Sequence, residues 1–252
     1  MKIKLFRLGK AFAVFDLITA LMIALGCILM SGSIMMTQVN TGEYIEIMNS
    51  PSLPLIVIDA GHGGEDVGAI GVNGVYEKDL NLEISFLLGE MLSNEGYQVF
   101  YTRTQDKLLY TEEQNIKGMR KIYDLKNRAS VVNEKAPYIF ISIHMNYFSI
   151  EKYSGFEVYY RKGDIESQKL AYDVADEVKL SADTDNKRTP KATDELYLLS
   201  NTTCPALLLE CGFLSNVAEC QKLCEKEYQK QLCFSIVCGI IKYESRKEPI
   251  LE

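Results

Sequence analysis

Short apolar runs alternate with longer amphipathic segments along most of the chain, and this alternation restricts the fold more than any other feature of the sequence. Short apolar runs bounded by turn residues are typical of buried parallel strands, and apolar residues recurring every three or four positions are typical of helices that cover a sheet. We therefore predict a single α/β domain with a mainly parallel, twisted sheet of about six strands and helices on both faces. The expected strands are residues 55–59, 97–102, 138–143, 155–160, 196–199 and 206–209, and the expected helices are residues 77–96, 122–135, 165–180 and 217–244.

The N-terminal segment predicts export. Four Lys or Arg residues lie within the first ten positions, an apolar stretch follows over residues 11–36, and the next basic residue is Lys78. Positive charge on one side of an apolar stretch places the N-terminus inside and the remainder outside a membrane, and this stretch is long enough to span one. We expect residues 1–36 to be a signal or membrane anchor and residues 37–53 to be a linker. Cleavage near Ser31, or a lipoprotein signal ending at Cys27, are the alternatives.

Charge and cysteine usage exclude some functions. Beyond residue 40 the chain carries 23 Lys or Arg against 33 Asp or Glu, a charge of −10 with no basic stripe, so no nucleic-acid partner is expected. Six of the seven cysteines lie between Cys204 and Cys238, without a C-x-x-C spacing. Free cysteine packs as a small apolar residue, so a core role is favoured, with disulfides or a metal knuckle as alternatives.

The chain contains only two histidines, and both follow apolar strands. His62 comes after the expected strand 55–59, His144 after 138–143, and Glu210 directly after 206–209. Because the carboxyl ends of parallel strands meet at one edge of a sheet, we expect the three side chains to lie together. A lone histidine in this position is more often a hydrogen-bonded structural residue, but finding both histidines at the same edge favours a shared role.

Glu77 adds a carboxylate to this edge. It begins the expected helix 77–96 and shares the helix face of Leu80 and Ile84, which points to the core. A carboxylate there must be paired, capping or coordinating, although helix-terminus electrostatics alone is an alternative explanation. Two imidazoles and a carboxylate are a recurring catalytic zinc set that leaves a position for water. We therefore predict one Zn²⁺ bound by His62, Glu77 and His144.

Glu210 is the candidate catalytic residue. As a general base it would take a proton from the attacking water and pass it to the leaving amine, whereas a structural ion pair is the alternative role. The glycine-rich loop does not predict a nucleotide cofactor, because Asp66 replaces the third glycine of the dinucleotide pattern. A Cys211 nucleophile is disfavoured, since its side chain should point to the opposite side of the strand from Glu210.

Five ordered segments carry a family resemblance: Asp59-Ala60-Gly61-His62-Gly63-Gly64, Glu77-Lys78-Asp79-Leu80-Asn81-Leu82, Asn127-Arg128-Ala129, Ser142-Ile143-His144-Met145-Asn146 and Glu210-Cys211-Gly212-Phe213-Leu214-Ser215-Asn216. Together they resemble the zinc-dependent N-acetylmuramoyl-L-alanine amidases of the amidase-3 type. The resemblance implies a catalytic domain over residues 54–246, with His62, Glu77 and His144 binding zinc and Glu210 catalytic. It also implies a substrate, peptidoglycan glycan strands with stem peptides, cleaved between the lactyl group of N-acetylmuramic acid and L-alanine.

Finer features resemble the spore germination (CwlD-like) branch of that family. These are the compact size, the membrane-targeting N-terminus and Tyr197-Leu198-Leu199 before the last strand, while Met145 and Cys211 are mild departures from the family pattern. Members of the branch strip peptides from the spore cortex so that muramic-δ-lactam can form, which implies a place in the forespore or cortex space, at the outer face of a membrane. Activation or targeting would come from the anchor or a partner protein. A zinc peptidase acting on cross-links and a non-catalytic wall-binding module are the alternatives.

Overall fold

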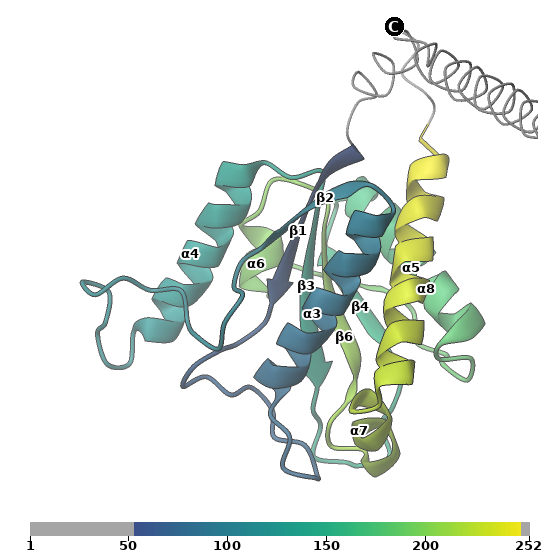
Figure 1. Ribbon diagram of the computed structural model, residues 1–252, viewed down its shortest axis with the longest axis horizontal. Helices are drawn as coiled ribbons and strands as arrows, with labels where there is room; N and C mark the ends of the chain where they lie inside the picture. Colours follow the sequence, from purple (N-terminus) through teal and green to yellow (C-terminus); the bar gives the residue numbers. More distant parts are fainter. Residues whose placement is uncertain (1–52, 248–252) are drawn as a thin grey trace, which may run out of the picture. The chain divides into compact units, whose positions relative to one another are not determined.

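A six-stranded sheet forms the centre of the computed structural model, which describes residues 53–247 (Figure 1). The strands lie in the order β2-β1-β3-β6-β4-β5, and every neighbouring pair is parallel except β4 with β6. The predicted mainly parallel α/β fold is therefore confirmed. The strands are β1 Leu53–Ala60, β2 Tyr97–Tyr101, β3 Ile139–Asn146, β4 Glu157–Arg161, β5 Lys191–Thr193 and β6 Ala206–Phe213.

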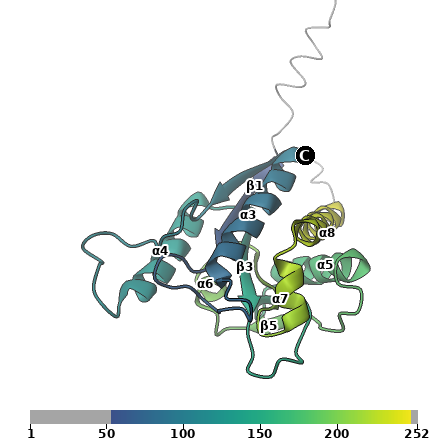
Figure 2. The ribbon, with the colours of Figure 1, turned by 60° about the horizontal axis from the view of Figure 1, so that its bottom comes forward.

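Helices cover both faces of the sheet, as predicted (Figures 1 and 2). On one face, Leu80, Ile84 and Leu88 of the first long helix pack in a large apolar core that also holds Leu232 and Ile236 of the last one. A smaller core lies on the other face. The first face carries α3 Glu77–Asn94, α5 Ile165–Ser181, α7 Val217–Leu223 and α8 Lys226–Ser245, and the second carries α4 Arg120–Lys135 and α6 Tyr197–Ser200.

The prediction of a strand at residues 196–199 is wrong. This segment forms the short helix α6, and the sixth strand is β5, inside a stretch that we expected to be a loop. Leu198 and Leu199 are neighbours in sequence yet both belong to the smaller core, which a strand could not achieve because its side chains alternate between faces. β5 is a short, polar edge strand, so its sequence carried no apolar signal.

The expected helix over residues 217–244 is two helices, because α7 ends at Leu223 and α8 begins at Lys226. The break affects one cysteine: Cys224 caps the end of α7 and is exposed, contrary to the predicted core role. All six cysteines of the described segment are free, and four of them are buried as predicted, namely Cys204, Cys211, Cys220 and Cys233.

Both ends of the described chain lie at the amino edge of the sheet, opposite the edge where the parallel strands end. Leu53 begins β1 at this edge. Near the other end, the Tyr97 hydroxyl donates a charge-assisted hydrogen bond to Glu244 of α8, and Lys247 Nζ lies 4.2 Å from the Tyr138 ring centre. The predicted anchor and nearly all of the predicted linker lie outside the described residues. Within residues 53–247, no helix has the length and apolarity needed to span a bilayer.

Candidate metal centre and active site

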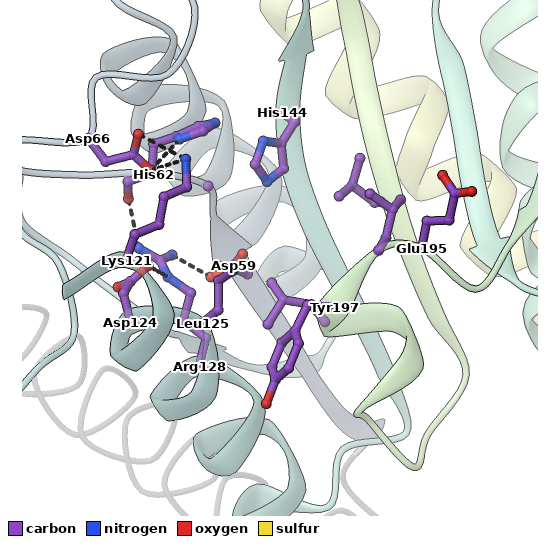
Figure 3. A pocket seen from close by; sticks show the side chains of 14 residues that line it. Asp59, His62, Asp66, Lys121, Asp124, Leu125, Arg128, His144, Glu195 and Tyr197 are labelled. Carbon is purple, nitrogen blue, oxygen red and sulfur yellow. Dashed lines mark hydrogen bonds and ion pairs between the residues drawn. The ribbon is translucent and has the colours of Figure 1, made fainter. Parts of the chain in front are cut away.

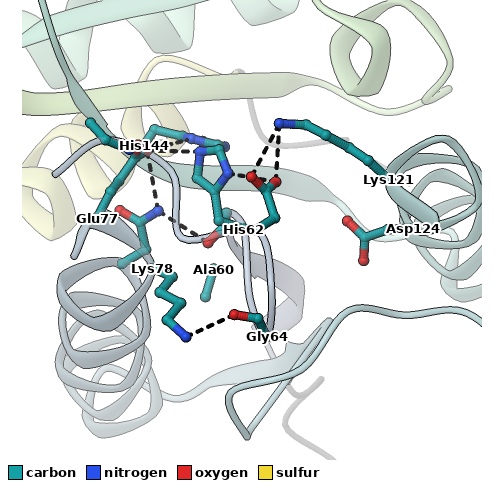
Figure 4. A network of polar contacts seen from close by, with 12 residues as sticks. Ala60, His62, Gly64, Glu77, Lys78, Lys121, Asp124 and His144 are labelled. Atoms are coloured by element: carbon teal, nitrogen blue, oxygen red, sulfur yellow. Dashed lines mark hydrogen bonds and ion pairs between the residues drawn. The ribbon is translucent and has the colours of Figure 1, made fainter. Parts of the chain in front are cut away.

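The two histidines and Glu77 converge at the carboxyl edge of the sheet (Figure 4). His62 lies in the loop after β1, Glu77 is the first residue of α3, and His144 lies near the end of β3. One ligand atom from each residue lies within 4.8 Å of the other two. Glu77 Oε1 lies 3.1 Å from His62 Nε2 and 2.9 Å from His144 Nδ1, so the carboxylate oxygen bridges both imidazoles. This confirms the expected proximity of the three side chains.

Glu77 is held by the backbone as well as by the histidines. Its side chain is nearly fully buried, Oε2 accepts a hydrogen bond from Ala69 N at 2.7 Å, and Oε1 accepts one from Met145 N at 3.1 Å. Burial alone would raise the pKa of Glu77, but hydrogen bonds from His144 and His62 outweigh it and keep that pKa well below its usual range. The carboxylate is therefore ionised and fixed in orientation.

Two glycines of the loop leave the space that these side chains occupy. A Cβ on Gly61 would lie 2.2 Å from His144 Cε1, and a Cβ on Gly68 would lie 2.4 Å from Glu77 Oε2. Gly68 also has a φ of +66°, a conformation that side chains rarely adopt. The glycine-rich loop thus leaves room for the side chains of the candidate metal centre.

Asp66 orients His62 and was missed by the sequence analysis. Asp66 Oδ2 lies 2.8 Å from His62 Nδ1, which leaves Nε2 to face Glu77, and Lys121 Nζ lies 3.1 Å from the same carboxylate oxygen. Burial would lower the pKa of His62, but its hydrogen bonds to Asp66 and Glu77 raise that pKa to about 9. A carboxylate behind an imidazole is a common support for a metal ligand. The one sequence signal for this role of Asp66 is its position four residues after His62 in a glycine-rich loop.

Two buried arginines fix the backbone around His62. Arg128 Nη1 donates to Asp59 Oδ1 at 2.7 Å and Nη2 donates to the His62 carbonyl oxygen at 2.7 Å. Arg103 Nη2 donates to the Gly61 carbonyl oxygen at 3.0 Å. The positions of Arg103 and Arg128 in the sequence did not predict this contact with the loop. They satisfy backbone oxygens in the turn where β1 ends, so they position the loop without reaching the centre themselves.

Glu210 lies beside His144, as predicted, because the two residues are partners in the β3–β6 pairing. Its Oε2 is buried and has no hydrogen-bond partner within residues 53–247, and burial raises the pKa of Glu210 to about 7. A carboxyl group in this state can both accept and donate a proton near neutral pH. Cys211 packs in the large core on the opposite face of β6, which agrees with the expectation that it is no nucleophile.

A cavity of about 290 Å³ lies beside the two histidines, on the α4 and α6 side of the centre (Figure 3). His62 and His144 line it together with Lys121, Glu195 and Tyr197. Its volume is near the lower end of the range for small-molecule sites. Part of a polymeric substrate can therefore reach both imidazoles from the outside.

Comparisons with known proteins agree with one another. The profile of the Amidase_3 family, described as N-acetylmuramoyl-L-alanine amidase, matches residues 56–242. The germination-specific N-acetylmuramoyl-L-alanine amidase of Bacillus subtilis is 36% identical over 200 residues, which cover 78% of this chain and 84% of the relative. The structure of the CwlD amidase from Clostridioides difficile, in complex with the GerS lipoprotein, is 38% identical with a TM-score of 0.75 over 77% of this chain and 100% of that chain. An N-acetylmuramoyl-L-alanine amidase from Clostridium difficile 630 is 31% identical, with a TM-score of 0.69 over 78% of this chain and 100% of that one.

The fold places a cluster of two histidines and a glutamate at the carboxyl edge of an α/β sheet, the edge where such sheets bind ligands. The family match runs from β1 into α8 and so includes all four residues of the centre. This chain belongs to the Amidase_3 family of N-acetylmuramoyl-L-alanine amidases, enzymes that act on peptidoglycan. The family expected from the five sequence segments is thereby confirmed.

Proposed function

We propose that this amidase depends on zinc, with His62, Glu77 and His144 as ligands of one Zn²⁺ and Glu210 as the catalytic residue. The observation that carries the proposal is the convergence of three ligand atoms within 4.8 Å. Imidazole nitrogen and carboxylate oxygen suit zinc, and three protein ligands leave a coordination position open. A bound zinc ion would supply Lewis acidity toward the amide carbonyl and toward water.

The protein's own groups move the proton. Glu210 accepts a proton from the attacking water while the new C–O bond forms at the lactyl carbonyl carbon. It then donates that proton to the nitrogen of L-alanine as the C–N bond breaks, which releases a free lactyl carboxylate and a stem peptide with a free amino group. The raised pKa of Glu210, about 7, suits a group that must do both.

The proposed setting is the spore cortex, where removal of the peptide would allow muramic-δ-lactam to form. Relatives named germination-specific and sporulation-specific amidases support this setting, the latter 32% identical over 170 residues. We further propose that residues 1–36 place a catalytic domain, residues 54–246, at the outer face of a membrane. The CwlD amidase structure contains the GerS lipoprotein, which supports a partner protein for this chain as well.

Metal removal and product analysis test the proposal. We expect about one zinc per chain, loss of activity on chelation, and recovery on adding zinc back, because the three ligands cannot polarise the amide without the ion. Activity is measured as release of stem peptides from purified peptidoglycan, with mass spectrometry of the digested glycan. Peptide-free muramic acid or its lactam is the expected product.

The peptidase alternative gives a different product. Opened cross-links with the bond from muramic acid to L-alanine intact would contradict the amidase proposal and favour a zinc peptidase. Full activity of a metal-free protein would contradict the zinc proposal alone. The Glu210 carboxyl group lies beside the three ligand groups, and its Oε2 has no hydrogen-bond partner among residues 53–247. This argues against a non-catalytic binding module, which has no need of such a group.

Replacing Asp66 with asparagine should weaken zinc binding about 10- to 100-fold, the usual cost of losing a carboxylate behind a histidine ligand. Zinc affinity is measured by competition with a chromophoric chelator. Glu65→Gln is the matched control. Glu65 is the neighbour of Asp66 in the sequence, its side chain is exposed and pairs with Arg120, and the substitution removes the same charge. Equal affinities for Asp66→Asn and the wild type would show that the contact from Asp66 to His62 does not support the metal.

A further inference from the structure

A second cavity, of about 300 Å³, lies on the far side of Glu210 from the histidines. Aromatic rings of Tyr153 and Phe213 form part of its wall, and Arg188 and Lys191 bring two positive charges to it. None of these residues belongs to the centre described above. They come from the β3–β4 loop, the end of β6, the loop before β5 and β5 itself.

The charges in this cavity do not balance. Glu157 is only 2% exposed, and its Oε1 pairs with both Arg188, at 2.9 Å, and Lys191. Its Oε2 accepts hydrogen bonds from the Tyr159 hydroxyl at 2.9 Å and from Asn146 Nδ2 at 3.2 Å. The carboxylate is therefore fully occupied, and two cations share a single anion. One positive charge is left over in a chain that is strongly acidic elsewhere.

Arg188 and Lys191 retain donors for a ligand. Arg188 donates through Nε to the Ser154 carbonyl oxygen at 2.7 Å and through Nη1 to Glu157, while its Nη2 makes no hydrogen bond within residues 53–247. The guanidinium group lies over the Phe213 ring at 4.7 Å, which holds it in place. The Lys191 side chain is 50% exposed, its Nζ lies 5.5 Å from the Tyr159 ring centre, and Glu157 is its one ion-pair partner within residues 53–247. An anion with an apolar neighbour fits this arrangement.

The strand order determines which part of the substrate reaches this cavity. His144 on β3 is paired with Glu210 on β6, and Glu210 is paired with Glu157 on β4, the strand next to β5 and Lys191. The proton donor thus lies between the proposed metal ligands and the two cations. Since Glu210 protonates the leaving amine, the leaving peptide must extend from the centre across β6 toward β4 and β5.

We propose that Arg188 and Lys191 bind a carboxylate of the leaving stem peptide. This rests on the proposed amidase function, in which the peptide is the leaving group. An acidic residue follows L-alanine in stem peptides, so the first free carboxylate lies about two residues, or about 7 Å of extended chain, from the cleaved bond. Glu210, which protonates the nitrogen of the cleaved bond, is one strand spacing, about 5 Å, from Glu157, whose Oε1 pairs with both cations, so the cations lie near that reach.

Two synthetic muramyl peptides that differ only in this carboxylate test the proposal. One carries the free carboxylate on the second residue, and the other carries its primary amide. For the full-length, zinc-loaded enzyme in detergent, we expect kcat/KM for peptide release to favour the free carboxylate about tenfold, as for one charge-assisted hydrogen bond, mostly through KM. Lys191→Gln should bring this preference close to one, and Lys191→Arg should restore it.

Lys187→Gln is the matched control, because it removes the same charge from an exposed residue outside this cavity and should keep the preference. Equal kcat/KM for the two substrates in the wild type, or an unchanged preference in Lys191→Gln, would overturn the carboxylate site and leave the amidase function intact. No peptide release from either substrate by the wild type would overturn the amidase function on which the site depends.

Discussion

Glu210→Gln should lower kcat for stem-peptide release about a thousandfold while the protein still binds one zinc per chain. The glutamine amide keeps the size of the side chain but can neither accept the proton of the attacking water nor return it to the leaving amine. General acid–base groups contribute about 10²- to 10⁴-fold, and in the proposed mechanism a single carboxyl group serves both steps. Steady-state kinetics and metal analysis of the same preparation measure the two quantities.

The zinc content separates the possible roles of Glu210. Unchanged kcat with zinc retained would refute the acid–base role, and loss of zinc would instead make Glu210 a ligand or a support of the site. Glu227→Gln provides the control for the chemical change, since Glu227 is an exposed residue of α8 whose ion-pair partner in the described part of the chain is the exposed Lys230. It should show wild-type kinetics.

The second large effect is expected from Arg128→Met, which should lower the free energy of unfolding by about 3–5 kcal/mol. Arg128 is 1% exposed, and methionine is an apolar side chain of similar reach. Its removal leaves the fully buried Asp59 and the buried Asp124 without the cation that pairs with both. Urea denaturation of metal-free wild type and variant measures the difference without the contribution of zinc binding.

The size of this loss should depend on pH. Burial alone would raise the pKa of Asp59. The Arg128 charge, with hydrogen bonds from Thr102 and Ser142, outweighs burial and holds this pKa at about 2, below its ordinary value of 3.8. In the wild type, the contribution of Asp59 to the free energy of unfolding is therefore fully present above pH 3.8 and is lost as the pH falls toward about 2. Without Arg128, burial should raise the pKa of Asp59 above 3.8, so its contribution decreases as the pH rises.

The deficit of Arg128→Met should consequently be larger at neutral pH than in acid. Arg120→Met on the same helix is the matched control, because Arg120 forms a partly exposed ion pair with Glu65 and should contribute about 1 kcal/mol or less. A deficit that is equal at both pH values would mean that Asp59 gains another partner in the variant, which keeps its pKa as low as in the wild type.

The convergence of the four residues could be predicted because each follows an apolar run or begins a helix. His62, His144 and Glu210 follow short apolar runs, so the rule that parallel strands end at a common edge was enough to bring them together. Glu77 was accessible because helical periodicity turns it toward the core. These inferences need only local pattern and one general rule of topology.

The surrounding residues depend on contacts that no local pattern reveals. Arg128 pairs with Asp59 across 69 positions, and Lys191 pairs with Glu157 across two strands that the sequence did not place together. The sequence could not distinguish the apolar run at residues 196–199, which overlaps α6, from a strand, since a run that short contains no complete helical period. It therefore indicated neither the contacts around the candidate metal centre nor the cavity beyond Glu210.

The position of the chain ends has a consequence for work on an insoluble polymer. Leu53 and Lys247 lie at the amino edge of the sheet, and the four residues of the centre lie at the opposite edge. The point at which residues 1–52 are attached therefore lies on the opposite side of the domain from the candidate site. The attachment point itself does not occupy the edge of the sheet that a glycan strand would have to reach.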